Sequence, residues 1–226
     1  MMRVAVLTAA LVSGAALMSL EMAGFRLVQP EFGSDIIVWG SLISVFLGGL
    51  AVGALVGGRL ADRRPALWKL GAIFVAGGAV ALAIPLYADA VLDWMFPGEG
   101  APLPSDWDQA ATDDGGLVVY LPPDLRWPTL GAGLLLFLVP SVLLGMVTPY
   151  AAKLLIHTMP HLGRGVGNVS GVSTVGAILG TLGTAFYLVA WMGTRWLLVS
   201  NGLVLVGLGV LLGALDVAVR SRGARE

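Results

Sequence analysis

Cysteine is absent from this chain, and charged residues are scarce. The 226 residues include no cysteine and two histidines, and only 12% of them are charged. The absence of cysteine excludes disulfides, thiolate metal sites and cysteine nucleophiles. Soluble domains carry about 25% charged residues, whereas 57% of this chain is hydrophobic. The composition therefore predicts a protein embedded in a membrane.

Six long apolar segments dominate the sequence. About 20 apolar residues cross a hydrocarbon core about 30 Å thick, and the segments that meet this length lie near residues 4–28, 36–61, 67–92, 129–156, 166–191 and 196–219. We expect an all-α fold in which residues 1–226 form one six-helix transmembrane bundle. Residues 93–128 contain prolines, which break helices, and we predict one long outer loop there.

Basic residues indicate the orientation, because Lys and Arg in short loops are retained on the cytoplasmic side. Ten of the 13 fall on one side of the predicted spans: Arg3, Arg59, Arg63, Arg64, Lys69, Lys153, Arg164, Arg220, Arg222 and Arg225. Both termini are therefore predicted to be cytoplasmic, with the chain in the bacterial inner membrane. We interpret the basic rim as this topology signal together with contact to anionic lipid, and we expect no nucleic-acid partner.

Glycines spaced four residues apart predict where helices pack. Lipid supplies no hydrophobic drive for helix association, so close approach of backbones at small residues replaces it. Gly49, Gly53 and Gly57 form a stripe on the second segment, which Gly48 and Gly58 widen. Two further pairs lie on the fifth and sixth segments: Gly176 with Gly180, and Gly209 with Gly213. We expect a helix of this chain or of another against each.

Glu21 lies within the first segment, where an ionisable side chain costs at least about 2.5 kcal/mol unless it finds a partner or water. Arg26 follows five residues later, an offset that turns the two side chains about 140° apart on a helix. They are no ideal intrahelical pair, so Glu21 either bonds to another helix or is protonated. A structural brace and a transported-ion site both remain open.

Hydroxyl side chains on the fifth segment are predicted to share one helical face: Ser170, Ser173, Thr174, Thr181 and Thr184. In one interpretation they line a polar path. In the other they bond to carbonyls of the preceding turn or join helices.

Metal binding and catalysis are not predicted. His157 and His161 have the spacing of two ligands on one helix face, but Pro160 interrupts that helix and no carboxylate or cysteine lies close in sequence. We expect no metal and no cofactor. The chain also contains no phosphate-binding glycine loop, no nucleophile elbow and no strand-helix alternation. We therefore expect no catalytic residues.

Several motifs carry a family resemblance. They are EMAGFRLVQP at residues 21–30, GGRLADRRP at 57–65, GMVTP at 145–149 and GTR at 193–195. In this order they resemble the membrane region of bacterial fused major-facilitator-like/spermidine synthase-like proteins. In that family an aminopropyltransferase-like cytoplasmic domain follows the membrane region. Only Arg220 to Glu226 follow the sixth segment here, so the family's catalytic residues have no counterparts, and we expect the chain not to be an enzyme by itself.

The stretch at residues 58–63 also resembles half of the loop motif between the second and third helices of major facilitator transporters. Gly58, Asp62, Arg63 and Arg64 belong to it, although Arg64 and Pro65 replace the second glycine and basic pair. The resemblance implies that these charges cap helix ends and gate closure. A local interpretation has Asp62 pairing with the nearby arginines. Six spans equal half of such a transporter, so transport would require a dimer or a partner.

Three functional hypotheses follow. The first is a non-catalytic integral membrane subunit that scaffolds other membrane proteins, a second copy of itself, or a soluble cytoplasmic partner. The second is a transporter or channel for a polyamine-like cation, with a path formed by Glu21, Arg26, Ser170, Thr174 and Thr181. The third is the membrane half of a split spermidine synthase-like enzyme.

Overall fold

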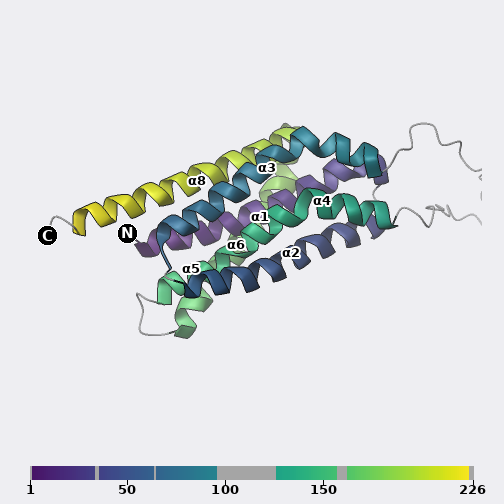
Figure 1. The fold of residues 1–226 in the computed structure, drawn as a ribbon. Helices are drawn as coiled ribbons and strands as arrows, with labels where there is room; N and C mark the ends of the chain where they lie inside the picture. Colours follow the sequence, from purple (N-terminus) through teal and green to yellow (C-terminus); the bar gives the residue numbers. More distant parts are fainter. Residues whose placement is uncertain (1, 34–35, 64, 96–125, 157–161, 224–226) are drawn as a thin grey trace, which may run out of the picture.

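Long helices lying side by side make up the computed structural model, which describes residues 2–33, 36–63, 65–95, 126–156 and 162–223 (Figure 1). Its helices are α1 (Met2–Phe32), α2 (Ile36–Asp62), α3 (Leu67–Met95), α4 (Arg126–Gly145), α5 (Val147–Ile156), α6 (Leu162–Gly183), the π-helical turn η3 (Thr184–Leu188), α7 (Val189–Trp191) and α8 (Thr194–Gly223). The described residues contain six spans long and apolar enough to cross a membrane. The predicted all-α, multi-pass membrane bundle is thus confirmed.

Both termini lie at one end of the bundle, here called the termini end (Figure 1). Helix α3 ends and α4 begins at the other end, here called the opposite end. The described helices extend a few residues beyond the predicted spans. Each span of the first half therefore runs in the opposite direction to its counterpart in the second half: the first to the fourth, the second to the fifth, and the third to the sixth.

Two spans contain interruptions that the sequence did not predict. The fourth span divides between α4 and α5 at Met146, because Pro149 has no N–H to donate to the carbonyl of Gly145. The fifth span comprises α6, the π-helical turn at residues 184–188, and α7. Turns of this kind inside α-helices occur frequently at functional sites.

Three pairs of helices make the closest contacts: α1 with α6, α2 with α4, and α3 with α8. Glycine permits this approach. A Cβ atom at Gly53 of α2 would lie 2.2 Å from the carbonyl oxygen of Val142 in α4. A Cβ atom at Gly180 of α6 would likewise lie 2.2 Å from the carbonyl oxygen of Ala15 in α1. Small residues at these points let the backbones touch, which drives helix association in lipid.

The second half of the chain repeats the packing of the first. An offset of 127 residues relates Gly53 to Gly180, and the same offset relates Ala15 to Val142, so the two 2.2 Å contacts are equivalent. Since the two halves run in opposite directions, they form an inverted-topology repeat, an arrangement also found in secondary transporters.

The same offset relates the contacts between the third and sixth spans. A Cβ atom at Gly209 would lie 2.7 Å from Cγ2 of Val75, and one at Gly202 would lie 2.6 Å from Cγ of Leu82. The offset of 127 residues relates Val75 to Gly202 and Leu82 to Gly209. The contact between Gly209 and Val75 is therefore equivalent to the contact between Leu82 and Gly202. The repeat therefore extends over all six spans.

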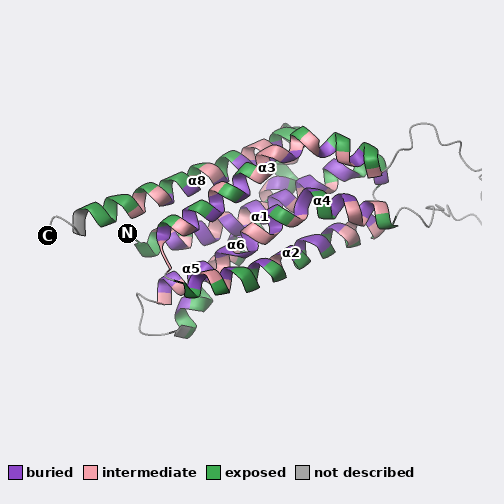
Figure 2. Ribbon diagram, in the orientation of Figure 1, coloured by how far each residue is buried: buried purple, intermediate pink, exposed green. Residues whose placement is uncertain are grey.

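Burial is uneven among the spans (Figure 2). In the most apolar window of each span, 50% of residues are buried in the first and 56% in the fourth, but only 11% in the fifth. Phe46 of α2 and Phe137 of α4 stack in the core with ring centroids 5.5 Å apart. The fifth span packs mainly on α1 and leaves its other faces exposed.

Candidate functional sites

A cluster of neutral polar side chains is buried where α1, η3 and α8 meet. Thr184 is fully buried and donates from Oγ1 to Oγ of Ser19 at 2.9 Å. Asn201 donates from Nδ2 to Oγ of Ser19 at 2.8 Å and to the carbonyl oxygen of Leu197 at 2.9 Å. Thr184 belongs to the hydroxyl residues predicted from the sequence, whereas Ser19 and Asn201 were not predicted, because an isolated polar residue in an apolar helix has no periodicity to detect.

A cavity of about 240 Å³ adjoins this polar cluster. Ser19, Thr184 and Asn201 line it together with small and aliphatic residues, and no charged residue of the described part of the chain does. Leu179 and Val204, which also line it, are 56% and 55% exposed. The cavity therefore opens toward the surface of the bundle between α6 and α8.

Glu21 and Arg26 do not meet in the structure. Glu21 is partly buried, and it forms no hydrogen bond or ion pair with any residue that the structure describes. Arg26 is exposed and donates from Nη1 to the carbonyl oxygen of Val189 at 3.4 Å. Ser19 and Glu21 are about 200° apart around α1, so Glu21 points away from the polar cluster.

The hydroxyl residues predicted to share one face of the fifth span do not form one polar lining. Ser170 and Thr174 are exposed, whereas Thr184 is buried against Ser19. Thr174 and Thr181 each donate at 2.9 Å to the backbone carbonyl four residues earlier. Thr174 and Thr184 lie about 80° apart around a helix, at the two edges of the predicted face, so one edge is exposed and the other packs against α1.

The inner-loop motif contains an ion pair at the termini end. Nζ of Lys153 in α5 lies 2.6 Å from Oδ1 of Asp62, the last residue of α2. Among the described residues Asp62 therefore pairs with Lys153 of α5, and not with Arg63 as the local interpretation predicted. Arg63 is exposed, and Arg64 lies outside the described residues. The repeat offset relates Lys153 to Arg26, and each reaches the end of the neighbouring helix.

The glycines of α2 divide between two environments. Gly49 and Gly53 contact α4, and Gly57 contacts Met146 between α4 and α5. A Cβ atom at Gly48 or Gly58 would meet nothing within 4 Å. The prediction that Gly48 and Gly58 widen the packed stripe was thus wrong. A step of four residues returns to nearly the same helix face, but a step of one turns by about 100°.

The remaining predicted glycines pack within the chain. Gly176 and Gly180 lie against α1, and Gly209 lies against α3. A Cβ atom at Gly213 would meet nothing within 4 Å. The backbone nitrogen of Gly213 nevertheless lies close to α3, 3.1 Å from the position of a Cβ atom at Gly71.

One face of α6 carries small residues that are exposed. Gly167, Ser170, Gly171 and Thr174 follow one another at helical spacing and are all exposed. A Cβ atom at Gly167 or Gly171 would meet open space. We call these four residues the α6 small-residue face. It lies on a different side of the helix from Gly176, which contacts α1.

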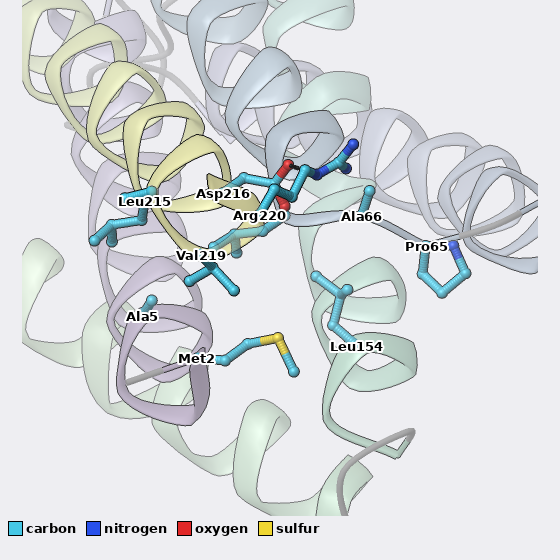
Figure 3. Close-up of a pocket in the computed structure, with 11 residues that line it drawn as sticks. Met2, Ala5, Pro65, Ala66, Leu154, Leu215, Asp216, Val219 and Arg220 are labelled. Atoms are coloured by element: carbon cyan, nitrogen blue, oxygen red, sulfur yellow. Dashed lines mark ion pairs between the residues drawn. The ribbon is translucent and has the colours of Figure 1, made fainter. Parts of the chain in front are cut away.

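A second cavity, of about 360 Å³, lies at the termini end (Figure 3). Met2, Leu154 and Val219 supply apolar walls from α1, α5 and α8. Asp216 and Arg220 of α8 line it as an ion pair, with 2.7 Å between Oδ2 and Nε. The cavity thus combines an apolar interior with one charged edge.

Metal binding has no support among the residues that the structure describes, which contain no group of three candidate ligands. His157, His161 and most of the predicted outer loop lie outside those residues. Comparison with protein-family models, with curated proteins and with solved structures finds no match. What the structure establishes is a six-helix membrane-spanning protein with an internal inverted repeat.

Proposed function

We propose that this protein is a non-catalytic integral membrane subunit that packs against a transmembrane partner through the α6 small-residue face. The main support is the low burial of the fifth span, 11% against 56% for the fourth. A span attached along one side leaves the rest of its surface for lipid or for another protein.

The composition of the α6 small-residue face favours a protein over lipid. Gly167 and Gly171 have open space at their Cβ positions. Inside this same chain, glycines with this spacing at Gly49 and Gly53 receive the backbone of α4. Exposed Ser170 and Thr174 provide hydroxyl groups, which join helices in membranes. The face therefore has the chemistry of a helix contact whose second helix is supplied by another chain.

The partner is either another membrane protein or a second copy of this chain. The cavity at the termini end, with Asp216 and Arg220 at its edge, offers a separate place for a soluble partner. The membrane half of a split spermidine synthase-like enzyme is one form of this arrangement, in which the soluble partner supplies the catalytic residues.

Assembly is tested by enlarging the α6 small-residue face. Protein purified natively in mild detergent should contain a stoichiometric partner or a second copy, and the double variant Gly167→Leu, Gly171→Leu should lose it. Gly207→Leu is the matched control, because Gly207 is an exposed glycine of α8 with open space around it. A monodisperse monomer of the wild-type chain, or retention of the partner by the double variant, would refute the proposal.

A cysteine scan distinguishes the two kinds of partner. Since the chain has no cysteine, a single cysteine at Ser170 forms a disulfide-linked dimer only when two copies meet at this face. Absence of that dimer, with a partner still present, assigns the face to a different protein.

Transport of a polyamine-like cation is a second candidate, supported by Glu21, a carboxyl group inside a span without a partner among the described residues. Purified protein in liposomes should then take up labelled spermidine, and Glu21→Gln should reduce the flux. Unchanged flux in that variant would remove Glu21 from the path.

A further inference from the structure

We propose that the cavity beside Ser19, Thr184 and Asn201 binds a neutral lipid whose head group carries a hydroxyl donor. The cavity measures about 240 Å³ and combines aliphatic walls with one polar corner. Three of its polar side chains are held in place by one another, as the hydrogen bonds of Ser19 show. The corner is therefore preorganised to receive a single polar group.

Hydrogen-bond accounting shows what that group must be. Asn201 uses its Nδ2 amino group for Ser19 and for the carbonyl oxygen of Leu197. Because a carbonyl can only accept, the amide nitrogen must face Leu197 and the amide oxygen must face away. Oδ1 accepts no hydrogen bond from the described residues.

The oxygen of Asn201 remains accessible although the residue is only 8% exposed. No side-chain polar atom in the described part of the chain is both fully buried and unpartnered. Oδ1 therefore keeps accessible surface, and Asn201 lines the cavity. An acceptor that faces mainly aliphatic walls without a donor is costly, so a ligand that donates a hydrogen bond is favoured there.

The internal repeat shows that the fold itself does not need this polar corner. The offset of 127 residues relates Ser19, Thr184 and Asn201 to Met146, Gly57 and Phe74 in the other half. There the equivalent contact joins Gly57 to the backbone of Met146. A Cβ atom at Gly57 would lie 2.6 Å from Cα of Met146. One half is thus closed by apolar packing, whereas the other half has polar groups, a π-helical turn and a cavity.

The ligand's class follows from the walls and the entrance. Among the residues that the structure describes, no charged side chain lines the cavity, which disfavours a site built for a cation or a phosphate head group. The entrance passes exposed Leu179 and Val204, between α6 and α8, which are not among the closely packed helix pairs. A ligand that enters there comes from the lipid phase. A neutral lipid with one hydroxyl group, such as a diacylglycerol, satisfies both conditions.

Photolabelling tests the site. Full-length protein in phosphatidylcholine vesicles is irradiated with a diazirine-bearing diacylglycerol, and the labelled peptides are located by mass spectrometry. We expect adducts on the walls of the cavity. Unlabelled diacylglycerol should compete about fivefold better than its acetylated form, which lacks the donor, as expected for a hydrogen bond of about 1 kcal/mol.

Two variants and a control separate specific binding from general contact with lipid. Gly183 lines the cavity and has open space at its Cβ position, so Gly183→Leu should fill the cavity and abolish labelling. Gly207→Leu should not. Asn201→Leu should leave labelling in place but remove the preference for the hydroxyl form. Melting curves establish that each variant is folded.

Each outcome bears on the inference. Equal competition by the hydroxyl and acetylated lipids in wild-type protein would overturn the role of Asn201 as an acceptor. Labelling that is absent from the cavity, or that persists in Gly183→Leu, would overturn the site itself and leave a cavity that holds water or acyl chains. None of these results depends on the α6 small-residue face, so the two proposals fail separately.

Discussion

The contact between Gly53 and α4 provides the sharpest test of how this bundle is held together. A methyl group at residue 53 would lie 2.2 Å from the carbonyl oxygen of Val142 and 2.9 Å from Cα of Gly145. Carbon and oxygen normally approach to about 3.3 Å, so Gly53→Ala requires the helices to separate by about 1 Å. Both obstructing atoms are backbone atoms, which cannot swing away as a side chain does.

The expected loss can be isolated with a matched variant. Overpacking a close contact costs about 1–3 kcal/mol, and the gain in helix propensity from Gly to Ala, about 1 kcal/mol, acts in the other direction. Gly48→Ala has the same gain but meets open space. The two variants should therefore differ by about 1–3 kcal/mol in unfolding free energy, measured by SDS titration of helicity in mixed micelles.

The repeat adds a second requirement to this test. Gly180→Ala introduces an equivalent contact, 2.2 Å from the carbonyl oxygen of Ala15, and should lose a similar amount of stability to Gly53→Ala. If Gly53→Ala were as stable as Gly48→Ala, the close packing of α2 on α4 would be refuted. If only Gly180→Ala were tolerated, the equivalence of the two halves would fail.

Three further predictions concern polar groups. Asp62→Asn should cost no more than about 1 kcal/mol of unfolding free energy, because the pair with Lys153 is largely exposed; a loss several times larger in the same titration would show that the pair holds the helix ends together. Thr184→Val should cost about 0.5–1.5 kcal/mol through the lost hydrogen bond to Ser19; no change would mean that the bond is not formed in the membrane. A single cysteine at Ser221 should react with an impermeant maleimide only after cells are opened, and reaction in intact cells would reverse the orientation predicted from the basic residues.

Composition and segment length were sufficient for the fold class, because a membrane core excludes nearly every alternative to the apolar helix. The Gly49, Gly53 and Gly57 stripe also indicated a packed face, since a spacing of four residues is a local property of the helix. The same spacing did not show that Gly48 and Gly58 face open space. That distinction depends on which side of α2 the neighbouring helix occupies.

The sequence by itself determined that water is excluded from most of this chain, because runs of apolar residues and few charges leave the helical bundle as the favourable state. Tertiary structure alone decided which polar residues meet. Ser19, Thr184 and Asn201 are separated by up to 182 residues, and no periodicity connects residues on three different helices. Their hydrogen bonds arise because α1, η3 and α8 converge there, which only the packing of the whole bundle determines.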